Sequence, residues 1–340
     1  MKSHLIAVRH RRRAQRGWSL IEVLVAVGVI ALLLAIAFPA IQSLRDGSRR
    51  AQCMNNLRQV NLATQNFETA NMSFPLGIHV PPGTTSNKPN ELFTWLADVA
   101  SFTDGSSVDV LEHAATDTIA DIIALQGERA TDLLHSPRPW ARCPADSDAS
   151  IRNARRSSET DVGDLALGHY VAANNVGICH GLRNGITRAA PNGTFHGIEA
   201  EDSASVEDGL SNTVFYSERI YGSFRSSQPF ANAALIYGSR GVGNPADPTR
   251  PGAHDATFGA AGQVNRFDFT IEGLAQHGVS SGHAGGVIIA LGDGSVRFLQ
   301  QDVDSYYDDN ESIERPETTS EYGIWERLIA INDGEPMGSF

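Results

Sequence analysis

The carboxylate of Glu22 is the first chemically notable group, because it lies in an otherwise uncharged segment. Residues 18–41 are 24 consecutive residues in which Glu22 carries the only charge. At about 1.5 Å per residue, a helix of this length crosses a hydrocarbon core of about 30 Å. Placing a carboxylate in lipid costs roughly 2.5–3.5 kcal/mol on insertion scales. We therefore expect Glu22 to have a partner.

The residues around Glu22 resemble the class III signal of type IV prepilins and pseudopilins. Six basic residues and no acid precede Gly17, Trp18 follows it, and Glu22 is the fifth residue after it. The resemblance implies that a prepilin peptidase/N-methyltransferase cuts after Gly17 and methylates the new N-terminus, Trp18, where the family usually has Phe. It also makes Pro39 the helix-kinking proline of this family. Glu22 would then pair with the Trp18 ammonium of a neighbouring pilin-like subunit, which cancels two charges in an apolar interior.

The same segment also fits an ordinary membrane anchor with Glu22 near the interface. A removable signal peptide, however, has its small-residue cleavage site after the apolar run, whereas Gly17 precedes the run. Cleavage after Gly17 would leave the helix on the mature chain. The basic residues 1–17 favour a cytoplasmic N-terminus under the positive-inside rule. We therefore expect a single-pass inner-membrane protein with most of the chain outside the cytoplasm.

The net charge argues against nucleic acid as a partner. The 340-residue chain carries −12, and removing the six basic residues of the leader takes this to −18. A phosphate backbone repels an acidic surface of this kind.

Three cysteines, Cys53, Cys143 and Cys179, allow three single pairings and leave one thiol over. A disulfide is compatible with a location outside the cytoplasm. We favour Cys53–Cys143, which would tie the long N-terminal helix to the globular part. The chain has no Cys-x-x-Cys motif, so neither zinc nor redox chemistry is predicted.

Ser280 lies in a Gly-Val-Ser-Ser-Gly sequence that has the letters of a nucleophile elbow. That motif needs a strand before it and a helix after it. A glycine-rich turn and a strand follow here, so we interpret Ser280 as a loop residue and predict no enzyme.

His283 is a candidate base or ligand. We favour a structural role in which its ring bonds the loop backbone, while Asp293 bonds its own turn. His254-Asp255 and His277 lie within 30 residues of His283 but lack helical ligand spacing, so we predict no metal there.

An acidic loop offers oxygen ligands of the kind that calcium prefers. It lacks the glycine and the terminal glutamate of an EF-hand, and we favour a solvated loop with no cofactor. The calcium candidates are Asp302, Asp304 and Asp308, with Asp309 and Glu311 nearby.

The elements that must position these residues begin with the helix. We expect it to bend at Pro39, to continue as an amphipathic helix over residues 42–72, and to end at residues 73–77. The clearest hairpin is Gly286–Leu291, a Gly-Asp-Gly-Ser turn and Val296–Leu299. Its first arm is apolar on both faces, which predicts a central strand. Further strands are expected at Tyr170–Ala172, Gly193–Ile198, Thr213–Ser217 and Leu235–Tyr237, and helices at residues 91–100, 107–134 and Ile324–Ile331.

A second resemblance covers residues 49–299. The stretches RRAQCMNNLRQVNLATQNF, RCPAD, ASVEDGLSNTVFYSER and SGHAGGVIIALGDGSVRFL are similar to one family of prepilin-like proteins abundant in planctomycete bacteria. Its large C-terminal domain has unknown function and is sometimes labelled solute-binding-like. The predicted fold is α+β, a long helix packed on a mainly antiparallel sheet. The predicted organisation is a leader (1–17), a transmembrane or filament helix (18–41), its amphipathic continuation (42–72) and an exported domain (73–340).

Two functions fit these features. The leading hypothesis is a structural subunit of a pilus or a type II secretion-like assembly. The alternative is a membrane-tethered module that binds a carbohydrate or another solute outside the cytoplasm.

Overall fold

The computed structural model describes thirteen segments of the chain. They are residues 18–79, 92–103, 116–146, 154–156, 164–176, 192–195, 200–220, 234–235, 238–239, 256–260, 264–265, 278–307 and 319–334. The chain divides into two units, Met1–Gly47 and Ser48–Phe340.

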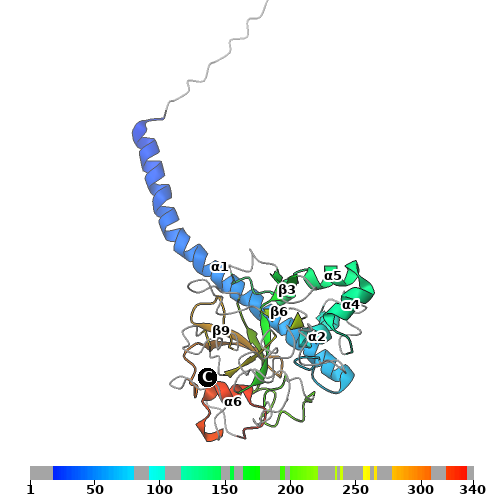
Figure 1. Ribbon diagram of the computed structural model, residues 1–340. Helices are drawn as coiled ribbons and strands as arrows, with labels where there is room; N and C mark the ends of the chain where they lie inside the picture. Colours follow the sequence, from blue (N-terminus) through cyan, green and yellow to red (C-terminus); the bar gives the residue numbers. More distant parts are fainter. Residues whose placement is uncertain are drawn as a thin grey trace, which may run out of the picture. The chain divides into compact units, whose positions relative to one another are not determined.

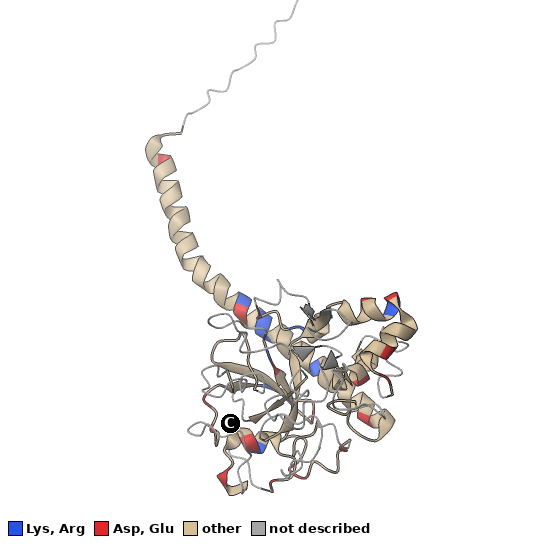
Figure 2. Cartoon of the chain, viewed as in Figure 1, with Lys and Arg blue, Asp and Glu red and all other residues tan. Residues whose placement is uncertain are grey.

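The first unit contains the start of helix α1 (Leu20–Asn71), which continues through Pro39 without a break. Its leucine, isoleucine, valine and phenylalanine side chains are almost all exposed, and this part of the helix is nearly free of charge (Figure 2). It is long and apolar enough to cross a membrane. The predicted bend at Pro39 stays a prediction.

The second unit contains the rest of α1, which has a partly polar buried face. The buried residues are Cys53, Asn56, Leu57, Val60, Asn61, Ala63 and Thr64. The polar residues of this face form hydrogen bonds with the rest of the domain. Asn61 Nδ2 donates to the Leu291 carbonyl at 2.6 Å, and the hydroxyls of Thr64 and Tyr216 lie 2.6 Å apart. The expected apolar stripe is therefore incomplete, because the helix packs on backbone carbonyls as well as on apolar side chains.

A five-stranded sheet forms the centre of the second unit (Figure 1). The strands occur in the order β10 (Val296–Gln300), β9 (Gly286–Leu291), β5 (Val214–Glu218), β4 (Tyr170–Asn175) and β8 (Thr257–Gly259). All neighbours are antiparallel except β4 and β8. The α+β class and the central position of Gly286–Leu291 are confirmed.

Alternating side chains of the sheet face two separate cores, as the period of two in a strand requires. On β9, Ile288 and Ala290 join the core that includes α1 and Trp95, whereas Val287, Ile289 and Leu291 join the core around Trp325. The second part of α1 and helix α6 (Ile324–Ile329) therefore cover opposite faces of the sheet.

Smaller elements complete the described part of the domain. The helices are α2 (Trp95–Thr103), α4 (Ile119–Gln126), α5 (Glu128–His135) and the short 3-10 turns η1 (Pro139–Ala141) and η6 (Thr319–Glu321). There are two minor sheets in the described part of the chain. In one, β1 (Leu92–Phe93) pairs with β7 (Gly238–Ser239). In the other, β3 (Asp164–Gly168) lies between β2 (Ala154–Arg156) and β6 (Ala234–Leu235).

Two predicted elements differ from the structure. Of the predicted strand Gly193–Ile198, residues 193–195 belong to no strand, because their backbone follows β4 only through isolated bonds such as Gly193 N to the Asn174 carbonyl at 3.1 Å, and residues 196–198 lie outside the described residues. Residues 92–93 form a strand before α2, whereas the sequence predicts one helix over residues 91–100.

Candidate functional site

The N-terminal turn of α1 places Glu22 against Ser19. The Ser19 backbone N–H donates to Glu22 Oε2 at 2.8 Å, and the Glu22 N–H donates to Ser19 Oγ at 3.2 Å. This reciprocal pair is a capping box, which satisfies two N–H groups that the helix start leaves without partners. The Ser-x-x-Glu spacing before an apolar run is visible in the sequence, but the sequence-based interpretation gave Glu22 only the role of pairing between subunits.

The predicted processing site lies just before this turn. Gly17 is outside the described residues, whereas Trp18 is described and 78% exposed. The predicted cleavage and methylation therefore stay predictions.

A disulfide joins Cys53 on α1 to Cys143, just after η1. This is the pairing favoured from the sequence, and both residues are buried. The bond fixes α1 to the Arg-Cys-Pro-Ala-Asp segment of the domain, which is separated from Cys53 by 90 residues of sequence.

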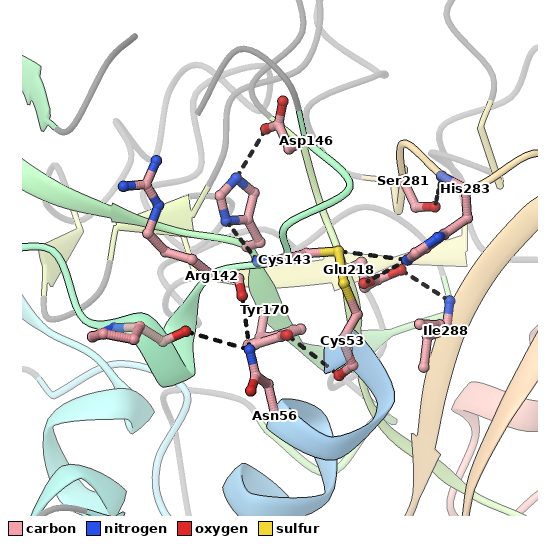
Figure 3. The surroundings of a disulfide bond; sticks show 12 residues. Cys53, Asn56, Arg142, Cys143, Asp146, Tyr170, Glu218, Ser281, His283 and Ile288 are labelled. Carbon is pink, nitrogen blue, oxygen red and sulfur yellow. Dashed lines mark hydrogen bonds and ion pairs between the residues drawn. A yellow bond between two sulfur atoms is a disulfide. The ribbon is translucent and has the colours of Figure 1, made fainter. Parts of the chain in front are cut away.

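Side chains on both sides hold the Cys143 segment in place (Figure 3). Asn56 Nδ2, one turn after Cys53, donates to the Arg142 carbonyl at 2.8 Å and to the Pro139 carbonyl at 3.3 Å. The Cys143 N–H donates to His169 Nδ1 at 3.2 Å, and His169 Nε2 lies 2.8 Å from Asp146 Oδ2. Since His169 accepts at Nδ1, its proton is on Nε2, directed at the carboxylate.

Glu218 and His283 complete a cluster around the disulfide (Figure 3). His283 Nε2 lies 3.5 Å from Cys143 Sγ and 3.6 Å from Glu218 Oε1. The imidazole therefore faces a sulfur and a carboxylate, so the predicted bond from this ring to the loop backbone is wrong. It is the His283 backbone N–H that bonds within the loop, to Ser281 Oγ at 2.8 Å.

Glu218 is a fully buried carboxylate at the end of β5. Its Oε2 accepts the Ile288 N–H at 3.1 Å, but its Oε1 has no hydrogen-bond partner. Burial raises the pKa of the Tyr170 phenol well above its ordinary value, and the negative charge of Glu218 raises it further. The cluster thus far consists of two sulfurs, an imidazole and a carboxylate oxygen, and both cysteines belong to the hydrophobic core.

The other predicted site residues are distributed elsewhere. Asp293 Oδ1 accepts the Ser295 N–H at 2.9 Å, so its predicted local turn bond is confirmed. The buried Ser280 hydroxyl accepts the Ile220 N–H at 3.3 Å, and a turn and β9 follow it, so its predicted place in a loop is confirmed. Asp302 and Asp304 are exposed.

Several candidate residues lie outside the described residues. They are Cys179, His254, Asp255, His277, Asp308, Asp309 and Glu311. The calcium candidates therefore stay predictions.

Sequence reasoning missed Glu218. This residue lies in a stretch that stands out only as a family landmark, and nothing in its spacing predicts that β5 ends beside Cys143. The one signal in the sequence that pointed to this cluster was the position of His283 just before a central strand.

Two family models match this chain. Residues 42–306 match the family described as "Protein of unknown function (DUF1559)", and residues 12–38 match the "Prokaryotic N-terminal methylation motif". No curated protein and no solved structure matches the chain.

Proposed function

Because this chain belongs to the DUF1559 family and carries a prokaryotic N-terminal methylation motif, we propose that it is a prepilin-like subunit of a pilus or a type II secretion-like assembly. A prepilin peptidase/N-methyltransferase would cut after Gly17 and methylate Trp18. The helix from Trp18 onward would then anchor the subunit in the inner membrane, with its domain outside the cytoplasm, and pack against other pilin-like subunits.

The observation that supports this proposal best is the exposed apolar part of α1 with one carboxylate in its first turn. Cutting after Gly17 would place an ammonium group on Trp18, at the helix end where the backbone dipole is already positive. The Glu22 carboxylate, bonded to the Ser19 N–H, would lie close enough to offset that charge. In an assembly, the same carboxylate could instead pair with the ammonium group of a neighbouring subunit.

The test separates the charge of Glu22 from its capping role. Either glutamate or glutamine can close a capping box. Glu22→Gln therefore keeps the helix start but removes the charge, whereas Glu22→Ala removes both. We expect both variants to be processed and both to lose cross-linking to other pilin-like subunits in cell envelopes. Asp46→Asn, which removes an exposed acid further along α1, is the matched control and should cross-link normally.

Two outcomes would count against the proposal. If Glu22→Gln assembles normally and only Glu22→Ala fails, Glu22 acts as a helix cap and not as a charge partner. If neither the unmodified chain nor the variants cross-link to other pilin-like subunits, the apolar helix is a plain anchor.

We also propose that the domain is not an enzyme. The buried Ser280 hydroxyl is engaged with the backbone of Ile220, and the His283 ring faces the disulfide cluster. A hydrolytic activity of the purified chain that disappears in Ser280→Ala, with the fold intact, would contradict this. We do not favour the alternative of a solute-binding module, because the family description, a protein of unknown function, names no ligand.

A further inference from the structure

Four side chains that can bind a metal converge from four separate segments of the domain. Cys53 comes from α1, Cys143 from the segment after η1, Glu218 from the end of β5, and His283 from the loop before β9. One ligand atom of each lies within 4.8 Å of the other three. Two sulfurs, an imidazole nitrogen and a carboxylate oxygen form a donor set of the kind that binds zinc.

Two distances in this cluster match edges of a zinc tetrahedron. Bond lengths of about 2.3 Å to sulfur and about 2.0–2.2 Å to nitrogen and oxygen give an N–S edge of about 3.5 Å and an N–O edge of about 3.4 Å. The observed distances from His283 Nε2 are 3.5 Å to Cys143 Sγ and 3.6 Å to Glu218 Oε1. The two sulfurs, which are bonded to each other here, would have to separate to about 3.8 Å.

The buried oxygen of Glu218, which lies at ion-pair distance from His283 Nε2, also points to a cation. Glu218 is fully buried, and its Oε1, the atom that faces His283, has no hydrogen-bond partner. A buried polar atom without a hydrogen bond is costly and calls for an explanation, such as an ion. A metal bound at Oε1 would satisfy this atom.

We propose that Cys53, Cys143, Glu218 and His283 bind one Zn²⁺ when the two cysteines are reduced, so that the disulfide and the zinc site are alternative states of one cluster. An external dithiol would supply two electrons and two protons: its sulfurs become a disulfide, and the Cys53–Cys143 bond breaks to give two thiols. Zn²⁺ then displaces the two thiol protons and forms two Zn–S bonds. A newly made chain, whose cysteines are still thiols, can bind zinc directly.

In either state the cluster ties α1 to the domain. The zinc state also joins β5 and the loop before β9 to that link, because Glu218 and His283 are ligands only there. The cluster would thus keep the domain attached to its helix in both reducing and oxidising surroundings.

The test uses the full chain in detergent, on a Cys179→Ser background so that the third thiol plays no part. One sample is oxidised, and another is reduced with a phosphine under anaerobic conditions. We expect the reduced chain to bind one Zn²⁺ per chain by elemental analysis and the oxidised chain to bind none. Chelator competition gives the affinity. Co²⁺ in place of zinc should show the strong visible bands of a tetrahedral site and thiolate charge transfer.

Variants of the two ligands that are not cysteines decide whether the cluster or the thiols alone bind zinc. Glu218→Gln and His283→Asn should each weaken zinc binding by more than the about 10- to 100-fold that loss of an outer-shell partner costs. Glu321→Gln, an exposed glutamate on η6, and His135→Asn, at the end of α5, are matched controls that should not change it.

Three results would overturn the proposal. The first is a reduced, folded chain that binds no zinc. The second is equal zinc affinity in Glu218→Gln, His283→Asn and the controls, which would assign binding to the thiols alone. The third is an octahedral cobalt spectrum. The cobalt spectrum of the chain with all four ligands decides the question even if one of the variants fails to fold.

Discussion

Asn56 illustrates how one polar side chain of α1 fixes a distant segment. Its amide donates to two carbonyls of the segment before Cys143, at 2.8 and 3.3 Å. Asn56→Ala would leave these carbonyls without this donor inside the domain. We expect the free energy of unfolding to fall by about 1–3 kcal/mol, measured by urea denaturation.

Asn55→Ala is the control for this change, because Asn55 is the adjacent residue on the exposed side of α1. It should change the free energy of unfolding by no more than about 0.5 kcal/mol. If the two variants were equally stable, the amide of Asn56 would contribute nothing to the docking of the helix.

Part of the residue-scale picture is readable in the sequence. The Asp293 turn bond follows from local chemistry, and the Cys53–Cys143 pair is favoured because it links the helix to the domain. The contact of Glu218 with His283 was not predictable in this way. It depends on the pairing of β5 with β9 and on the place of the Cys143 segment beside α1, and both are long-range arrangements.

Glu326 gives a pH-dependent test at the scale of one element, the start of α6. Its carboxylate accepts the N–H groups of Gly323 and Tyr306 and the hydroxyl of Ser305. Burial nevertheless raises its pKa above the ordinary glutamate value, and these bonds only partly offset the rise. The folded chain therefore holds the carboxyl proton of Glu326 more tightly than the unfolded chain does. As pH rises from the pKa of this group in the unfolded chain to its pKa in the folded chain, its contribution lowers the free energy of unfolding.

Glu326→Gln replaces the carboxyl group with an amide that does not titrate. Comparison with this variant therefore isolates the pH-dependent contribution of Glu326 to stability. We expect the unfolding free energy of the unmodified chain, minus that of the variant, to fall as pH rises from below the ordinary glutamate pKa to neutrality. Urea denaturation of both proteins across this pH range measures it. A difference that stays constant or grows with pH would contradict the raised pKa.

The β9–β10 hairpin and α6 were found from sequence because their signals are local. The hairpin has a Gly-Asp-Gly-Ser turn between apolar arms, and α6 has apolar residues on one side. The region around residues 193–195 lacks such a decisive signal. Its apolar residue Phe195 is buried beside Trp95 and Tyr216 as part of a loop, so burial there does not reflect strand pairing.

At the scale of the whole molecule, the disulfide constrains a long stretch of chain. Cys53 and Cys143 are 90 residues apart in sequence, so the bond removes many conformations from the unfolded chain. We expect reduction to lower the free energy of unfolding by about 2–5 kcal/mol, measured by denaturation in the presence of a chelator, which removes zinc.

The double variant Cys53→Ser/Cys143→Ser is the control for reduction. Its stability should be low from the start and should not respond to the reductant. If the unmodified chain were equally stable with and without the reductant, the disulfide would not contribute to holding the domain together.

The fold class was predictable because the apolar run and the Asp-Gly turn between two apolar arms are strong signals in the sequence. The order of strands in the sheet was not, because β4 and β8 pair in parallel across a long stretch of intervening chain. The partly polar docking face of α1 was also hidden. Asn56 and Asn61 look like solvent-facing residues until the carbonyls that they bond are known.

The central claim is that the chain is processed like a prepilin, and mass spectrometry of the N-terminus of the protein isolated from its native membrane tests it most directly. We predict a chain that begins at Trp18 with a methylated amino group. A chain that still begins at Met1, or one cut beyond Phe38 so that the apolar helix is lost, would contradict it.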